Sequence, residues 1–171
     1  MKFVAASRLL TRNFAWHQAC GRYQHTSPLM ETNHTIEVLN SLLRGEISAI
    51  ETYAQAINKF PDSTAHRELR ELQTAHIDSA ELLRELVTEC GGNPSSDSGP
   101  WGGFAKSVEA VAAMLGETSA LDALKQGEAH GIEEYVEALE DETLDQEVKG
   151  AIREQLLAPL QEHVLTLESL A

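Results

Sequence analysis

The sequence predicts an all-α domain, an antiparallel four-helix bundle in which two helical hairpins are joined by a long crossover carrying a short extra helix. From residue 36 onward, apolar residues recur at intervals of three and four, which is the spacing of one helix face. Breaks that contain Gly or Pro divide this pattern into long segments. No run of alternating β-branched residues competes with the helical pattern, so we expect no sheet.

The first hairpin is predicted from two segments with a short link. The first helix is expected to start at a cap formed by Asn33 or Thr35 and to end at the break 61–63. The second helix is expected over residues 64–90, with the glycine pair 91–92 as its stop. Because the link is short, these two helices should be antiparallel neighbours.

The crossover is predicted from residues 93–103, which are rich in Gly, Ser and Pro and include Trp101. Residues 105–115 are expected to form a short helix within this connection. A third long helix should then start at a cap formed by Thr118 or Ser119. This arrangement places the two hairpins at opposite ends of a long connection.

The fourth helix is expected after the acidic turn 141–145. Pro159 lies inside it, one turn before His163. Proline lacks an N–H group and its ring crowds the preceding turn, so we expect a kink and a freed carbonyl at this point. The kink either redirects His163 or bends the helix around the core.

Length and charge define the domain organisation. The 171 residues suit one domain, with residues 1–30 as a leader or disordered extension and residues 31–171 as the bundle. The net charge is −14, and residues 1–30 carry basic residues but no acid. We therefore expect neither nucleic acid nor membrane as a partner, and a homo-oligomer through helix faces stays open. The protein is expected to be cytoplasmic, or mitochondrial if residues 1–29 are a transit peptide.

An internal repeat marks the candidate site. Six of thirteen positions are identical between residues 45–57 and residues 127–139, and the shared positions include a Gly-Glu pair and a Tyr seven residues after the Glu. In each copy the Glu, Glu46 or Glu128, lies on the apolar face of its helix, where a carboxylate is costly unless it is paired. The tyrosines, Tyr53 and Tyr135, are expected to fill the core, with a hydrogen bond to a neighbouring carboxylate as the alternative.

Each of the four helices carries one ionisable residue on its apolar face. In chain order these residues are Glu46, His76, Glu128 and His163. If the hairpins fold alike, the four side chains converge, and two carboxylates with two imidazoles suit iron, manganese or zinc. The alternative is a polar core without metal, in which Glu–His hydrogen bonds set the helix register. No further cofactor is expected.

The order of these residues resembles the ferritin-like superfamily, in which two helices each give a Glu and two others each give a Glu-x-x-His pair. Gln73 and Leu160 stand three residues before His76 and His163, where that pattern has bridging carboxylates, so a standard di-iron centre is not expected. Residues 35–171 more narrowly resemble the bacterial ferritin-like family labelled domain of unknown function 2383. The residues that carry this resemblance are Gly45-Glu46, Gly91-Gly92-x-Pro94, Gly127-Glu128, Tyr135 and His163.

The functional prediction is a metal-binding bundle with a redox or stress-related role, in which any catalysis would oxidise bound iron or act on peroxide. The resemblance itself implies a fold but no reaction. The competing hypothesis is a structural or interaction protein without enzymatic activity, whose inner Glu and His residues form a hydrogen-bonded polar core.

Overall fold

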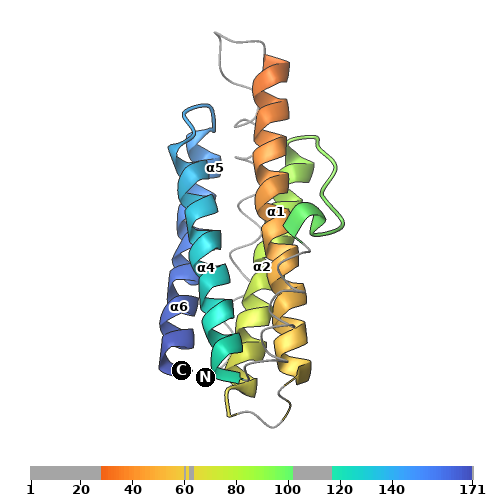
Figure 1. Ribbon diagram of the computed structural model, residues 1–171. Helices are drawn as coiled ribbons and strands as arrows, with labels where there is room; N and C mark the ends of the chain where they lie inside the picture. The colour runs from red at the N-terminus through yellow and green to blue at the C-terminus, as the bar shows by residue number, and fades with distance from the viewer. Residues whose placement is uncertain (1–27, 60, 62–63, 102–116, 171) are drawn as a thin grey trace, which may run out of the picture.

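The computed structural model describes residues 28–59, 61, 64–101 and 117–170 (Figure 1). In this part of the chain the protein is all-helical and builds a four-helix bundle, as the sequence predicts. The elements are α1 (Pro28–Lys59), α2 (His66–Glu89), the short 3-10 turn η2 (Gly99–Trp101), α4 (Glu117–Glu140), α5 (Gln146–Ala151), the π-helical stretch η3 (Ile152–Leu157) and α6 (Ala158–Leu170). Among the described helices, none combines the length and apolar composition needed to cross a bilayer.

The bundle consists of two hairpins that lie side by side (Figure 1). Helix α1 packs along α2, and α4 packs along α6, while α1 also contacts α4 and α2 also contacts α6. Helix α4 begins at the end of the bundle where α1 ends, so that α2 and α4 run in the same direction (Figure 1). The short helix predicted over residues 105–115 lies outside the described residues.

The start of the first helix differs from the prediction. Helix α1 begins at Pro28, so Asn33 and Thr35 lie inside it, and the predicted cap at these residues is wrong. Proline is well suited to the first turn of a helix because that turn leaves its N–H groups unpaired. The domain boundary predicted at residue 30 falls inside α1, and residues 1–27 lie outside the described part of the chain.

The stop predicted for the second helix is confirmed at atomic detail. Gly91 has a φ of 80°, its N–H donates to the Thr88 carbonyl, and the Gly92 N–H donates to the Val87 carbonyl. These two bonds form a Schellman motif, in which a left-handed glycine satisfies the last carbonyls of the helix. The chain beyond it is held on α1, where Asn40 bonds to the backbone of residues 93 and 95.

The last helix contains a π-helical stretch instead of a simple kink. Segments α5, η3 and α6 follow one another with helical backbone angles at the junctions Ile152 and Ala158. The π-helical stretch ends just before Pro159. Since Pro159 cannot donate to the carbonyl four residues earlier, the wider turn accommodates its ring without ending the helix. His163 lies on the buried face of α6 beyond this stretch.

The core consists of two apolar clusters with a polar layer between them. The first cluster packs residues of α1, α2, α4, α5, η3 and α6, including Leu39, Leu43, Leu83 and Ile152. The second cluster packs Tyr53, Ile57, Leu69, Leu124 and Leu167. His76, Glu128 and His163 lie along the chain between members of these two clusters, and Glu46 lies between Leu43 and Ile47 of the first cluster. The candidate site is therefore enclosed by apolar packing on both sides.

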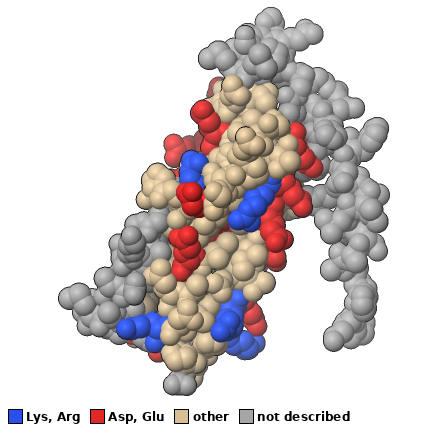
Figure 2. All heavy atoms as spheres, turned by 90° about the vertical axis from the view of Figure 1, so that its right-hand side faces the viewer, with Lys and Arg blue, Asp and Glu red and all other residues tan. Residues whose placement is uncertain are grey.

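Charge on the outside of the bundle is mostly negative. On the face that lies to the right in Figure 1, acidic side chains border an uncharged area and outnumber the basic ones (Figure 2). This distribution agrees with the net charge of −14.

Candidate metal centre

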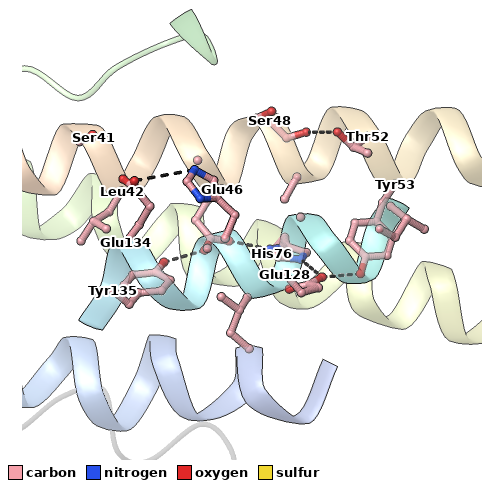
Figure 3. A pocket seen from close by; sticks show the side chains of 17 residues that line it. Ser41, Leu42, Glu46, Ser48, Thr52, Tyr53, His76, Glu128, Glu134 and Tyr135 are labelled. Carbon is pink, nitrogen blue, oxygen red and sulfur yellow. Dashed lines mark hydrogen bonds and ion pairs between the residues drawn. The ribbon is translucent and has the colours of Figure 1, made fainter. Parts of the chain in front are cut away.

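The four ionisable residues predicted from the sequence meet in the middle of the bundle. Glu46, His76, Glu128 and His163 come from α1, α2, α4 and α6, and their exposed fractions are 4%, 2%, 4% and 6%. His76 lies between the two carboxylates, with Nδ1 at 2.8 Å from Glu46 Oε2 and Nε2 at 3.0 Å from Glu128 Oε1 (Figure 3). His163 faces the other oxygen of the second carboxylate, with Nδ1 at 3.5 Å from Glu128 Oε2.

Two tyrosines complete the network, and each donates a hydrogen bond to a carboxylate of the opposite hairpin. The Tyr135 hydroxyl donates to Glu46 Oε1 over 2.6 Å. The Tyr53 hydroxyl donates to Glu128 Oε1 (Figure 3). Both tyrosines are also buried in the apolar clusters, so they fill the core, as expected, and make the hydrogen bonds that the sequence analysis held as the alternative.

The local sequence explains why these groups share one face. Each Tyr lies seven residues after a Glu of its own helix, which is two turns along the same side. The imidazole of His76 packs between the Tyr53 ring at 5.2 Å and the His163 ring, which it meets edge-on at 5.0 Å. These ring contacts and the hydrogen bonds together hold the His76 ring in one orientation.

Electrostatics favour a charged His76 when only protons occupy the site. Burial acts to lower the pKa of His76, but the carboxylate of Glu46 and the hydrogen bonds to both carboxylates raise it to about 10. Burial acts to raise the pKa of Glu128, but the facing His163 and the bonded His76 lower it to about 2. Burial and the adjacent carboxylates raise the pKa of both tyrosine hydroxyls, which therefore stay protonated as donors.

Two buried polar atoms in the site have no hydrogen-bond partner. They are Oε2 of Glu128 and Nδ1 of His163, which face each other at 3.5 Å. That separation is too long for an ordinary hydrogen bond between N and O. A buried polar atom without a partner costs about 1–3 kcal/mol, and here the two groups face each other only at ion-pair distance, a contact that lowers the pKa of Glu128.

Three of the described residues form a group that could hold one metal ion. One ligand atom from each of His76, Glu128 and His163 lies within 4.8 Å of the others. Glu46 is outside this group and bonds to the far nitrogen of His76. The positions of the missing bridging carboxylates hold a buried Leu160 and Gln73, whose amide donates to the Ile50 carbonyl over 3.1 Å.

A cavity of about 90 Å³ reaches this site from the side where α1 and α4 face each other (Figure 3). Small residues form much of its wall, among them Gly45, Ala49 and Gly131, and Glu46 and Glu128 lie at its inner end. This cavity is not among the features predicted from the sequence. The signal was present as a second glycine in the repeat of α4, four residues after Gly127.

Two further histidines lie outside the group of Glu46, His76, Glu128 and His163, and one of them, His130, lines the cavity. His130 lies on the surface of α4 near Glu133 and Glu134, and His66 accepts a hydrogen bond from Arg70. Among the acidic residues around His130, Glu133 and Glu137 are exposed and Glu134 is half-buried beside the cavity.

Comparison with known proteins identifies one family. Residues 34–141 match the family described as Domain of unknown function (DUF2383), and this segment contains α1 from residue 34 onward, α2 and α4. No curated protein and no solved structure matches the sequence.

Proposed function

The chain belongs to the family described as Domain of unknown function (DUF2383), and we propose that it binds one transition-metal ion at His76, Glu128 and His163. The observation that carries the proposal is the facing pair of buried atoms without hydrogen-bond partners, Glu128 Oε2 and His163 Nδ1. A cation between them would satisfy both atoms.

The hydrogen bonds of His76 support its role as a ligand. Its Nδ1 bonds to Glu46, so that Nε2 is the nitrogen directed at Glu128. Metal-bound histidines usually donate their second ring N–H to a carboxylate, which fixes the tautomer and raises the basicity of the ligating nitrogen. Glu46 is therefore proposed as an outer partner of the metal site, and Tyr135 holds it in place.

The donor set narrows the choice of metal. Two imidazole nitrogens and one carboxylate suit iron, manganese or zinc. Three protein ligands leave at least one position open, and an open position is typical of catalytic rather than structural metal sites. When bound, such an ion would supply Lewis-acid or one-electron chemistry.

We extend the proposal to a ferritin-like bundle with a redox or stress-related role, acting on iron as substrate or on peroxide. The repeat of Glu and His over two hairpins, and the common direction of α2 and α4, support a ferritin-like topology with its crossover (Figure 1). The missing bridging carboxylates separate this site from a di-iron centre. Any redox reaction would therefore be carried by a single ion.

A second candidate function rests on a different observation. Both nitrogens of His76 already bond to carboxylates, and its pKa is raised to about 10, so a proton alone can hold the network together. In this case the protein is a structural or interaction protein, and the polar layer sets the register of the helices.

Metal analysis distinguishes the two candidates. Protein purified without chelator is measured by inductively coupled plasma mass spectrometry, before and after reconstitution with Fe²⁺, Mn²⁺ or Zn²⁺. We expect close to one ion per chain and a higher unfolding temperature after reconstitution, because a metal that binds only the folded state stabilises it.

The variants Glu128→Gln and His163→Gln should lose the bound ion while keeping the far-ultraviolet circular dichroism of the bundle. The matched control is His66→Gln, which changes a histidine at the start of α2 that does not line the cavity and should keep the ion. Metal-free protein whose unfolding temperature is unchanged by all three ions would overturn the metal proposal and leave the structural candidate.

A further inference from the structure

We propose that the cavity between α1 and α4 admits an uncharged molecule smaller than benzene to the side of Glu128. The proposal concerns the ligand that reaches the site from outside. The role of such a molecule in the protein rests on the proposed metal-binding function, but its entry into the cavity can be tested without metal.

The cavity is shaped by small side chains on the two facing helices. Gly45 and Ala49 of α1 lie across from Gly131 of α4, and Leu160 of α6 closes one side. A Cβ atom added to Gly131 would stand 3.0 Å from Leu160 Cδ2, so the packing is tight there. A Cβ atom added to Gly45 would meet nothing within 4 Å. The open space is therefore on the Gly45 side, and this residue is exposed, which places it at the mouth.

The inner end of the cavity is lined by the carboxylates of the polar layer. Glu128 lines the cavity, is 4% exposed, and has one oxygen, Oε2, without a hydrogen-bond partner. The other polar groups at this end already bond to one another: Tyr135 and His76 with Glu46, and Tyr53 with Glu128. A molecule that reached this depth would therefore meet apolar walls and carboxylates that are already bonded, while Glu128 Oε2 is directed at His163, which does not line the cavity.

Charge and size define the class of molecule. The carboxylates of Glu46, Glu128 and Glu134 line the cavity and repel an anion. A hydrated cation would lose its water shell against the apolar wall, which is costly, whereas an uncharged molecule avoids both penalties. The volume of about 90 Å³ is smaller than the roughly 150 Å³ of an engineered apolar cavity that holds benzene. Gases and peroxide-sized molecules meet these limits.

Xenon tests the cavity in metal-free protein, because it enters apolar cavities of this kind. Titration with xenon, followed by ¹²⁹Xe and ¹H–¹⁵N nuclear magnetic resonance, should give a saturable shift confined to residues that line the cavity. Gly45→Leu and Ala49→Leu, which add side chains at the mouth and wall, should each reduce this shift at least fivefold.

The matched control is Gly150→Leu, a helical glycine on α5 that also has open space at its Cβ position but does not line the cavity. It should leave the xenon shift unchanged. Absence of a saturable shift in the parent protein, or an equal shift in Gly45→Leu and Ala49→Leu, would overturn the proposal.

A second experiment tests the charge of the ligand in protein loaded with Fe²⁺. Nitric oxide is added as an uncharged probe, and its binding is followed by stopped-flow absorbance in the parent chain and in Gly45→Leu. We expect at least tenfold slower binding in the variant, with the rate of iron uptake unchanged. Slower iron uptake with unchanged nitric oxide binding would identify a cation route and overturn the assignment of an uncharged ligand.

The two experiments separate this inference from the proposed function. Saturable xenon binding in a protein that takes up no metal would support the cavity and reject the metal site. Metal binding without a xenon site would support the metal site and reject the cavity.

Discussion

Replacing Tyr135 by Phe removes one hydroxyl from the polar layer and leaves the ring in the core. Tyr135 is 2% exposed and its hydroxyl is the one donor that the described structure gives to Glu46 Oε1. In Tyr135→Phe this buried oxygen loses its partner, while Glu46 Oε2 keeps its bond to His76. The equivalent change, Tyr53→Phe, is milder, because Glu128 Oε1 still accepts from His76.

The difference between the two oxygens sets the expected magnitudes. A buried charged acceptor left without a partner costs about 2–3 kcal/mol, so this is the expected loss in the free energy of unfolding for Tyr135→Phe. Loss of one of two donors to the same oxygen should cost about 1 kcal/mol, the net value of an ordinary hydrogen bond, for Tyr53→Phe. In a chain of this size each kcal/mol corresponds to about 2–4 °C in the unfolding temperature.

Urea unfolding followed by circular dichroism, at pH 7 with chelator present, measures both losses. Thr74→Val serves as the control, because it removes an exposed hydroxyl bonded within its own helix and should change stability by less than about 0.5 kcal/mol. A double-mutant cycle with Glu46→Gln should show that most of the Tyr135 effect disappears once the carboxylate is gone. Equal losses for the two tyrosine variants, or a neutral Tyr135→Phe, would refute the reasoning.

Three further predictions follow from the same contacts. In metal-free protein the pKa of Glu128 is lowered in the folded state, so its contribution to stability is lost as pH falls from the ordinary pKa of 4.5 through about 2. The pKa of His76 is raised, so its contribution is lost as pH rises from 6.5 through about 10. The urea concentration at the midpoint of unfolding should therefore depend less on pH in Glu128→Gln than in the parent protein. Gly92→Ala should destabilise by about 1–3 kcal/mol, because the new Cβ would lie 2.6 Å from Ile36 Cγ2, and an unchanged unfolding temperature would show that the contact relaxes freely. Leu160→Glu places a carboxylate three residues before His163, where the di-iron pattern has one, and should raise metal uptake measured by plasma mass spectrometry; uptake equal to the parent would count against the proposed geometry.

The helices were predictable because their apolar residues follow the helix period for many turns. The start of the first helix was not, because Asn33 is exposed and a polar residue on the outer face of a helix looks the same in sequence as an N-cap. Pro159 signalled a distortion, but whether proline produces a kink or a π-helical stretch depends on packing against the other helices.

For the site, the sequence predicted which residues face inward but not which atoms pair. The period of a helix fixes the face on which Glu46 or His76 lies, whereas the depth and rotation of neighbouring helices decide which side chains touch. Glu46 was expected to stand with the other three as a ligand, and the structure places its carboxylate against the outer nitrogen of His76. The bonds from Tyr53 and Tyr135 required knowledge of contacts between elements far apart in the chain.

Each copy of the repeat donates a tyrosine hydrogen bond to the carboxylate of the other copy, and these two bonds link the halves of the protein. Tyr53 serves a carboxylate 75 residues later, and Tyr135 serves one 89 residues earlier, so neither copy satisfies its own acid. The two halves of this single chain thus resemble the subunits of a twofold homodimer, in which each subunit supplies a residue to its partner's site. A substitution at Tyr53 is therefore felt first at Glu128, and the two copies are expected to change in pairs, Tyr53 with Glu128 and Tyr135 with Glu46, and not each within its own half.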